Sequence, residues 1–264
     1  MRVDKTESII RVTELNKSFQ NARDNLSVLR DISFSAHKGE VIGLVGPSGA
    51  GKTSLLRIIA GLLQADSGEV LIENMPPATY RADKGIGFVF QKPYLFPWRS
   101  LYKNLMMPIE MRKGQHIEDP DARIEKLLAL FGLLEFKNYY PYQLSGGMQQ
   151  RATVARALML NPQVLLLDEA FNALDELTRE QIWLDFRKIW KAEGLTTLLI
   201  THSIREAVFL SDKVFVMSKI PSTIIFECDL TDILPEERTF DLFHLPAFHA
   251  ANEQVRKHLF SETN

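Results

Sequence analysis

Runs of consecutive apolar residues alternate along the chain with segments whose apolar residues recur at helical spacing. Residues 164–167 are apolar at every position, as expected of a strand covered on both faces, and residues 196–201 have a similar pattern. Residues 41–45 form another strand-like run, which is followed at residues 54–59 by a helical pattern. This alternation of strands and helices favours an α/β fold with a largely parallel sheet.

The beginning, the middle and the end of the chain depart from this alternation. Residues 9–12 and 28–34 predict strands of a separate antiparallel layer. Between about residues 92 and 160, strand patterns give way to proline-punctuated sequence with helical periodicity, which predicts a helical subdomain inserted into the core. After Pro221 the pattern weakens, although residues 247–260 predict one amphipathic helix.

The composition limits the classes of protein to which the chain can belong. With 264 residues, 45% of them hydrophobic, the chain can bury a substantial core. Its net charge of −2 gives no electrostatic reason to expect nucleic acid or an anionic membrane surface as a partner. The single cysteine, Cys228, excludes an internal disulfide and predicts a small apolar side chain that is buried or half-exposed. No run approaches the roughly 20 apolar residues of a membrane span, so we expect any membrane association to go through a partner.

A glycine-rich loop lies between the strand predicted at 41–45 and the helix predicted at 54–59. Its glycines let successive N–H groups point at a phosphate, and the start of the helix adds unpaired donors and partial positive charge. Lys52 is expected to reach the β- and γ-phosphates, and the Thr53 hydroxyl to bind Mg²⁺. The alternative is an ordinary glycine-rich turn. The candidate nucleotide-binding residues are Gly46, Pro47, Ser48, Gly49, Ala50, Gly51, Lys52, Thr53 and Ser54.

Two carboxylates, Asp168 and Glu169, follow the predicted buried strand at 164–167. They lie at its carboxyl end, where open parallel sheets bind ligands. Asp168 is expected to hold Mg²⁺, mostly through water, and Glu169 to orient or deprotonate the water that attacks the γ-phosphate. Taken alone, the pair could equally be two solvated acids.

A second glycine motif begins the helical pattern after residue 144. Ser145 has N-cap chemistry, and Gly146 and Gly147 expose N–H groups at the helix start. The chain therefore carries a second anion-binding helix terminus, or else simply a well-capped helix.

The three motifs occur along the chain in the order glycine-rich loop, Ser145-Gly146-Gly147 and Asp168-Glu169, and in that order they resemble those of the ATP-binding-cassette (ABC) ATPases over about residues 8–220. The resemblance implies an α/β P-loop NTPase (RecA-like) core with an antiparallel β layer and an inserted helical subdomain. We expect the ABC ATPase domain to span residues 8–230 and a short C-terminal tail, with one helix, to span 231–264.

The resemblance also assigns roles to residues whose function is not indicated by their own sequence context. Gln91 matches the glutamine that senses Mg²⁺ and the permease, and His202 matches the switch histidine near the γ-phosphate. Asp175 matches the loop that joins two monomers. Phe19 stands where the family places an aromatic residue that stacks on adenine, although it could equally be a core residue. Ala170 departs from the family, which usually has proline there.

These roles imply an ATPase in which two copies, arranged head to tail, sandwich two ATP molecules with Mg²⁺. Each ATP would lie between one chain's glycine loop and the other chain's Ser145, Gly146, Gly147 and Asp175. Such subunits are peripheral at the cytoplasmic face of the inner membrane. They bind integral permease subunits there and serve a periplasmic or extracellular solute-binding protein indirectly, without nucleic acid.

Residues 91–98, 172–179 and 201–210 resemble the ATPase subunits of bacterial importers for nitrate, aliphatic sulfonates and taurine. The aromatic segment from Tyr94 to Trp98 is either the surface that binds the permease or internal packing. Two alternatives are a soluble ABC ATPase acting on DNA or the ribosome, and a regulatory module that does not hydrolyse ATP. The near-neutral charge disfavours the first, and the retained catalytic side chains disfavour the second. The solute, the direction of transport and the preference for ATP over GTP are not encoded in these motifs.

Overall fold

The central element of the fold is a mainly parallel sheet with the strand order β5-β6-β7-β3-β8-β9. We describe it from a computed structural model that covers residues 8–20, 25–112, 117–171 and 176–261. All residues of β3, β6 and β7 are buried, because helices cover one face of the sheet and a second layer covers the other. Only β9 pairs antiparallel, with β8. The strands are β3 (Val41–Val45), β5 (Gly87–Val89), β6 (Val164–Asp168), β7 (Thr196–Ile200), β8 (Lys213–Met217) and β9 (Ile224–Asp229).

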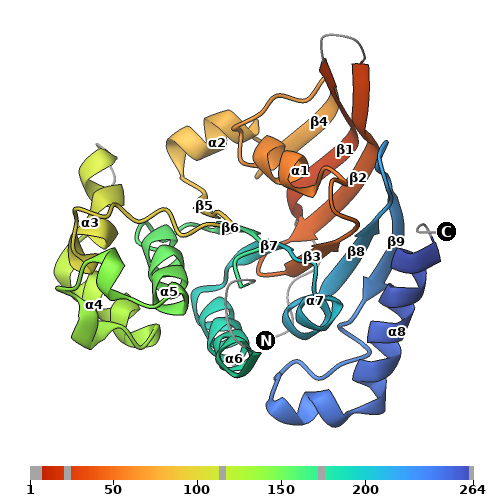
Figure 1. Ribbon diagram of the computed structural model, residues 1–264. Helices are drawn as coiled ribbons and strands as arrows, with labels where there is room; N and C mark the ends of the chain where they lie inside the picture. The colour runs from red at the N-terminus through yellow and green to blue at the C-terminus, as the bar shows by residue number, and fades with distance from the viewer. Residues whose placement is uncertain (1–7, 21–24, 113–116, 172–175, 262–264) are drawn as a thin grey trace.

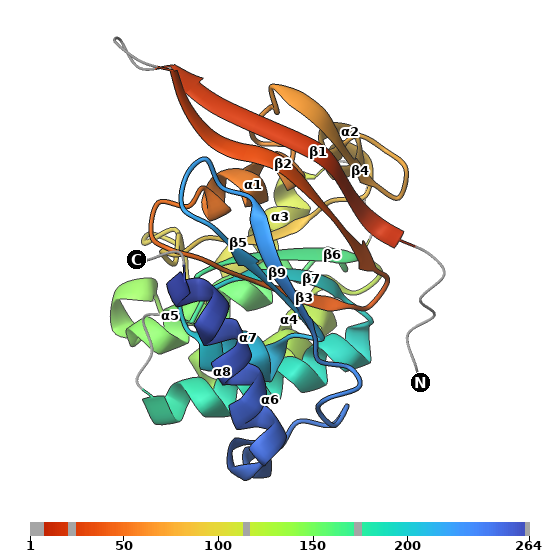
Figure 2. The same cartoon turned by 90° about the vertical axis from the view of Figure 1, so that its right-hand side faces the viewer.

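A smaller antiparallel sheet, of order β2-β1-β4, forms the second layer (Figure 2). Its strands are β1 (Ser8–Gln20), β2 (Asn25–His37) and β4 (Ser67–Ile72). Helix α1 (Lys52–Ile59) lies between the two sheets, where Leu55 and Ile59 share one apolar cluster with Ile10, Ile42 and Leu44. The predicted antiparallel layer is therefore confirmed, whereas β4, β8 and β9 have no counterpart in the sequence-based prediction.

Three helices cover the other face of the large sheet (Figure 1): α6 (Glu176–Glu193), α7 (Ile204–Leu210) and α8 (Pro246–Ser261). Phe248 and Val255 of α8 belong to the same buried cluster as Val208 of α7 and Val214 of β8. The last helix is thus part of the core. A short helix, α2 (Pro77–Asp83), follows β4.

The chain between β5 and β6 is helical and lies to one side of the sheets (Figure 1). Among the described residues from 90 to 163 there is no strand. Side-chain oxygens of Ser100, Asp119 and Ser145 accept N–H bonds at the starts of the three α-helices. The elements are α3 (Leu101–Met111), α4 (Pro120–Leu130), η1 (Leu134–Phe136), η2 (Pro141–Gln143) and α5 (Gly146–Ala157). The division into residues 8–230, 92–160 and 231–264 stays a proposal.

None of the helices in the described part of the chain has both the length and the apolar content needed to cross a membrane.

Candidate active site

The glycine-rich loop connects β3 directly to α1, and its backbone conformation requires glycine. Gly49 and Gly51 have φ values of +80° and +79°, in the left-handed region. A Cβ on Gly51 would lie 2.5 Å from Val28 Cγ1, because β2 packs closely against this turn. The loop is therefore held from behind by the antiparallel sheet, at the N-terminus of α1.

Lys52, the first residue of α1, folds back over the loop. Its ammonium donates to the carbonyl oxygens of Gly46 and Pro47, at 2.8 Å each. The side chain is buried, and burial lowers the pKa of Lys52, an effect opposed by the charges of Glu169 and Asp168. The arrangement places a cation at the centre of the loop, next to two carboxylates.

Thr53 and Asp168 bring oxygen atoms from α1 and the end of β6 together. Thr53 Oγ1 donates to Asp168 Oδ1 over 3.1 Å. Burial raises the pKa of Asp168, while the Thr53 hydroxyl lowers it. A hydroxyl and a carboxylate are ligands that suit Mg²⁺, which is usually held by one or two protein groups together with phosphates and water. The chemistry of this pair therefore fits the expected ion, although the described residues hold no cluster of three or more His, Cys, Asp or Glu side chains suited to a metal.

Side chains that follow three neighbouring strands meet at Glu169. Gln91 Nε2, after β5, donates to Glu169 Oε2 over 2.7 Å. His202 Nε2, after β7, lies 2.5 Å from Glu169 Oε1. The Glu169 backbone has a φ of +52° and donates its N–H to the Ile200 carbonyl at 2.9 Å. The structure thus joins three predicted side chains that are far apart in the sequence.

The second glycine motif lies at the start of α5, where Ser145 Oγ accepts the Met148 N–H over 3.3 Å. No hydrogen bond among the described residues links Ser145, Gly146 or Gly147 to the loop at 46–54. Asp175 lies outside the described residues.

Phe19 lies near the end of β1 with 36% of its surface exposed. The Lys17 ammonium is 5.4 Å from the centroid of its ring. This exposed position is compatible with stacking on a base and differs from that of a core aromatic residue.

One buried carboxyl near the site was missed by sequence reasoning. Glu206 of α7 has no exposed surface. The only sequence signal is its place directly before the buried apolar run 207–210.

Comparison with known proteins decides the family. A family model described as ABC transporter matches residues 29–172, more than half of the chain. The chain belongs to the ABC transporter family. It is an ATP-binding subunit with ATPase activity, and the prediction from its motifs is confirmed.

Relatives of this ABC ATPase include importer subunits. It is 39% identical over 259 residues to YtlC, an uncharacterized ABC transporter ATP-binding protein of Bacillus subtilis, and the match covers 96% of each chain. It is 42% identical to the taurine import ATP-binding protein TauB of Roseobacter denitrificans, over 76% of this chain and 74% of the relative. It is 35% identical to the nitrate import ATP-binding protein NrtD of Synechocystis sp., over 93% of each.

A solved ABC cassette has the same fold. It is MJ0796, described as a dimeric post-hydrolysis state bound to ADP and Pi. The two structures superpose with a TM-score of 0.75 at 30% identity, over 84% of this chain and 98% of that one. This similarity confirms the predicted fold class of the ABC ATPase.

Proposed function

We propose that this ABC ATPase hydrolyses MgATP in a head-to-tail dimer and thereby drives the import of a small solute through a membrane permease. The observation that carries the proposal is the convergence of Gln91 and His202 on Glu169, beside the Thr53–Asp168 pair. This edge of the sheet offers a base, a switch histidine and oxygen ligands next to a loop suited to phosphates.

Within one chain, the backbone N–H groups of the loop at 46–54 and the Lys52 ammonium bind the phosphates, and the Phe19 ring stacks on adenine. Thr53, Asp168 and Gln91 would supply ligands to Mg²⁺. When bound, this ion neutralises charge that develops on the phosphate oxygens.

Glu169 orients the attacking water and accepts its proton. The Gln91 amide and the His202 imidazole fix the Glu169 carboxylate through the contacts at 2.7 and 2.5 Å. His202 is 40% exposed, so its ring remains accessible to the γ-phosphate.

The second half of each ATP site comes from a second copy. Ser145, Gly146 and Gly147 form a capped helix start, and nothing lies within 4 Å of a Cβ placed on Gly146. Such an open helix start suits a phosphate brought by another chain. The dimeric form of the similar cassette MJ0796 supports this arrangement, in which Asp175 would also lie at the junction.

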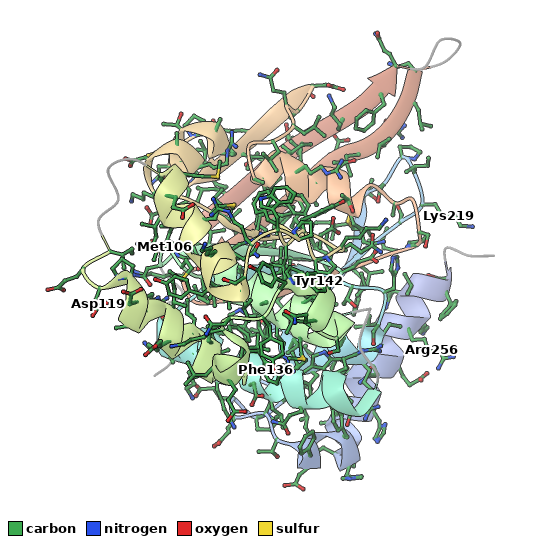
Figure 3. The ribbon with its side chains drawn as sticks, turned by 60° about the vertical axis from the view of Figure 1, so that its left-hand side comes forward. Met106, Asp119, Phe136, Tyr142, Lys219 and Arg256 are labelled. Atoms are coloured by element: carbon green, nitrogen blue, oxygen red, sulfur yellow. The ribbon has the colours of Figure 1, made fainter. Side chains whose placement is uncertain are left out.

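The permease would bind aromatic side chains of the helical region. Tyr94, Trp98 and Tyr142 are 60%, 70% and 75% exposed, whereas Leu95 is buried. The segment 94–98 therefore combines an internal anchor with exposed rings, which suit an apolar partner helix. Figure 3 shows Met106, Phe136 and Tyr142 among the side chains of this region. Import of a small solute such as nitrate, a sulfonate or taurine is favoured by relatives named as import subunits for these solutes.

The proposal is tested by isolating the tagged chain from gently solubilised membranes and identifying what accompanies it. We expect a polytopic membrane protein. Trp98→Ala should lose this partner, while Phe260→Ala, which removes an aromatic residue that is 52% exposed on α8, should keep it. Recovery with nucleic acid or ribosomes only would overturn the proposal in favour of a soluble ABC ATPase.

A further inference from the structure

Glu206 is a buried carboxyl whose polar atoms lack the hydrogen bonds that usually accompany burial. It lies in the first turn of α7, where its N–H donates to Ser203 Oγ over 3.2 Å. The side chain has no exposed surface, and neither carboxyl oxygen makes a hydrogen bond to any group in the described part of the chain. Such groups are uncommon in native proteins and need an explanation.

The polar and charged groups around Glu206 come from α6, from the end of β7 and from the residue after β6. Arg179 lies near the start of α6, and its charge favours the carboxylate, as does the nearby Thr201 hydroxyl at the end of β7. Glu169, after β6, disfavours it. Burial outweighs these effects and raises the pKa of Glu206 to about 8. The folded protein therefore keeps an uncharged carboxyl here at neutral pH.

The turn between β7 and α7 connects Glu206 with the site. Thr201 Oγ1 accepts the Ser203 N–H over 3.0 Å, so a hydrogen bond joins the two residues that flank His202. The preceding residue, Ile200, accepts the Glu169 N–H. One turn thus fixes the backbone of Glu169 and, through His202, its carboxylate.

Helix α6 is tied to the start of α7, directly after this turn. Arg205, which precedes Glu206 on α7, pairs with Glu180 of α6 at 2.7 Å. The start of α6 follows the segment 172–175, whose Asp175 is proposed to lie at the junction with the second copy. Glu206 therefore lies where the proposed base, the switch histidine and the start of α6 meet.

We propose that Glu206 is a positioning residue, whose buried carboxyl lies beside the Thr201 hydroxyl and supports the turn at residues 201–203, so that this turn holds the His202 imidazole against Glu169. The inference rests on the proposed function, because it assigns the base to Glu169 and the switch to His202. A role in stability alone does not account for Glu206, because an apolar side chain of similar volume is often as stable or more stable at such a position.

The test compares Glu206→Leu, Glu206→Gln and the wild-type chain in steady-state ATP hydrolysis and thermal unfolding. In Glu206→Leu we expect kcat to fall by about 10- to 100-fold, because small misplacements of reacting groups have effects of this size. KM for ATP should be unchanged, and the melting temperature should be unchanged or higher. Glu206→Gln should restore most of kcat, since an amide resembles the uncharged acid in shape and polarity.

Thr197→Val is a matched control. Thr197 lies on β7 and is also buried, and its hydroxyl has no hydrogen-bond partner in the described part of the chain. It is near the opposite end of the strand from His202, so this variant should keep full activity.

Full activity in Glu206→Leu would overturn the inference. The inference would also be overturned if the Leu and Gln variants lost kcat to the same extent and also had equally lowered melting temperatures. That result would indicate a purely structural role. Both results leave the proposed function intact if Glu169→Gln is inactive. A wild-type chain without ATPase activity would instead contradict the proposed function itself.

Discussion

Gly51→Ala perturbs the contact by which the antiparallel sheet holds the nucleotide loop. The added Cβ would lie 2.5 Å from Val28 Cγ1 and 3.0 Å from Leu29 Cδ2, at a residue whose φ is +79°. The left-handed backbone costs an alanine about 1–2 kcal/mol, and overpacking typically costs about 1–3 kcal/mol. After allowance for the lower entropy of the unfolded alanine chain, we expect a loss of about 2–4 kcal/mol in the free energy of unfolding.

Gly49→Ala separates the two effects. Gly49 has the same backbone conformation, with a φ of +80°, but nothing lies within 4 Å of its added Cβ. The expected loss is only about 1 kcal/mol, from backbone strain alone. Urea unfolding of both variants, each with and without ATP, measures the difference. Equal losses in the two variants would refute the reasoning, because they would show that the contact with β2 does not hold the loop.

Three other changes test separate parts of the site. Lys52→Ala should weaken ATP binding by about 10- to 100-fold, as expected for lost hydrogen bonds to a charged group. Titration calorimetry measures this loss, and the melting temperature of the variant should be unchanged. Ser145→Ala should cost about 1 kcal/mol of stability through loss of the N-cap and should lower hydrolysis without weakening ATP binding to the chain's own loop; weakened binding in the monomer would contradict the second-copy arrangement. Glu206→Gln should change the pH dependence of stability. Because the folded pKa of about 8 exceeds the ordinary value of 4.5, the folded chain holds a proton that the unfolded chain has released between these pH values. The group's stabilising contribution is therefore lost as pH rises through this window, by up to about 1.4 kcal/mol per pH unit. Urea unfolding across the window should show a shallower decline in the variant, and parallel curves would count against the buried acid.

The parts of the fold that local sequence determines were predictable. β3, the loop and α1 follow from an apolar run, clustered glycines and helical spacing, and α8 from its amphipathic pattern. β4, β8 and β9 were not predicted. In β4 and β9 most residues are exposed or half-buried, and the apolar runs, at residues 70–72 and 224–226, are short. β4 pairs with β1, which lies far away in the sequence, and β9 pairs with β8, which has a different pattern of apolar residues.

The site divides in the same way. The carboxyl ends of parallel strands lie at one edge, so Gln91, Glu169 and His202 could be expected at that edge, whereas their direct contacts follow from the neighbouring order β5-β6-β7, which only the structure gives. The burial of Glu206 could not be expected, because an acidic residue in the first turn of a helix normally faces solvent and interacts favourably with the helix dipole. In the folded chain it is buried on α7, which packs against β3, α6 and α8.

The most direct test of the central claim is the mass of the Glu169→Gln chain measured by light scattering during size-exclusion chromatography, with and without MgATP. The account predicts that this variant binds ATP without turnover, because the base is missing while the phosphate-binding groups remain. It should therefore be a dimer with MgATP and a monomer without it, and a Ser145→Ala substitution in the same chain should weaken the dimer. A Glu169→Gln chain that binds ATP and stays a monomer at all concentrations would contradict the head-to-tail arrangement.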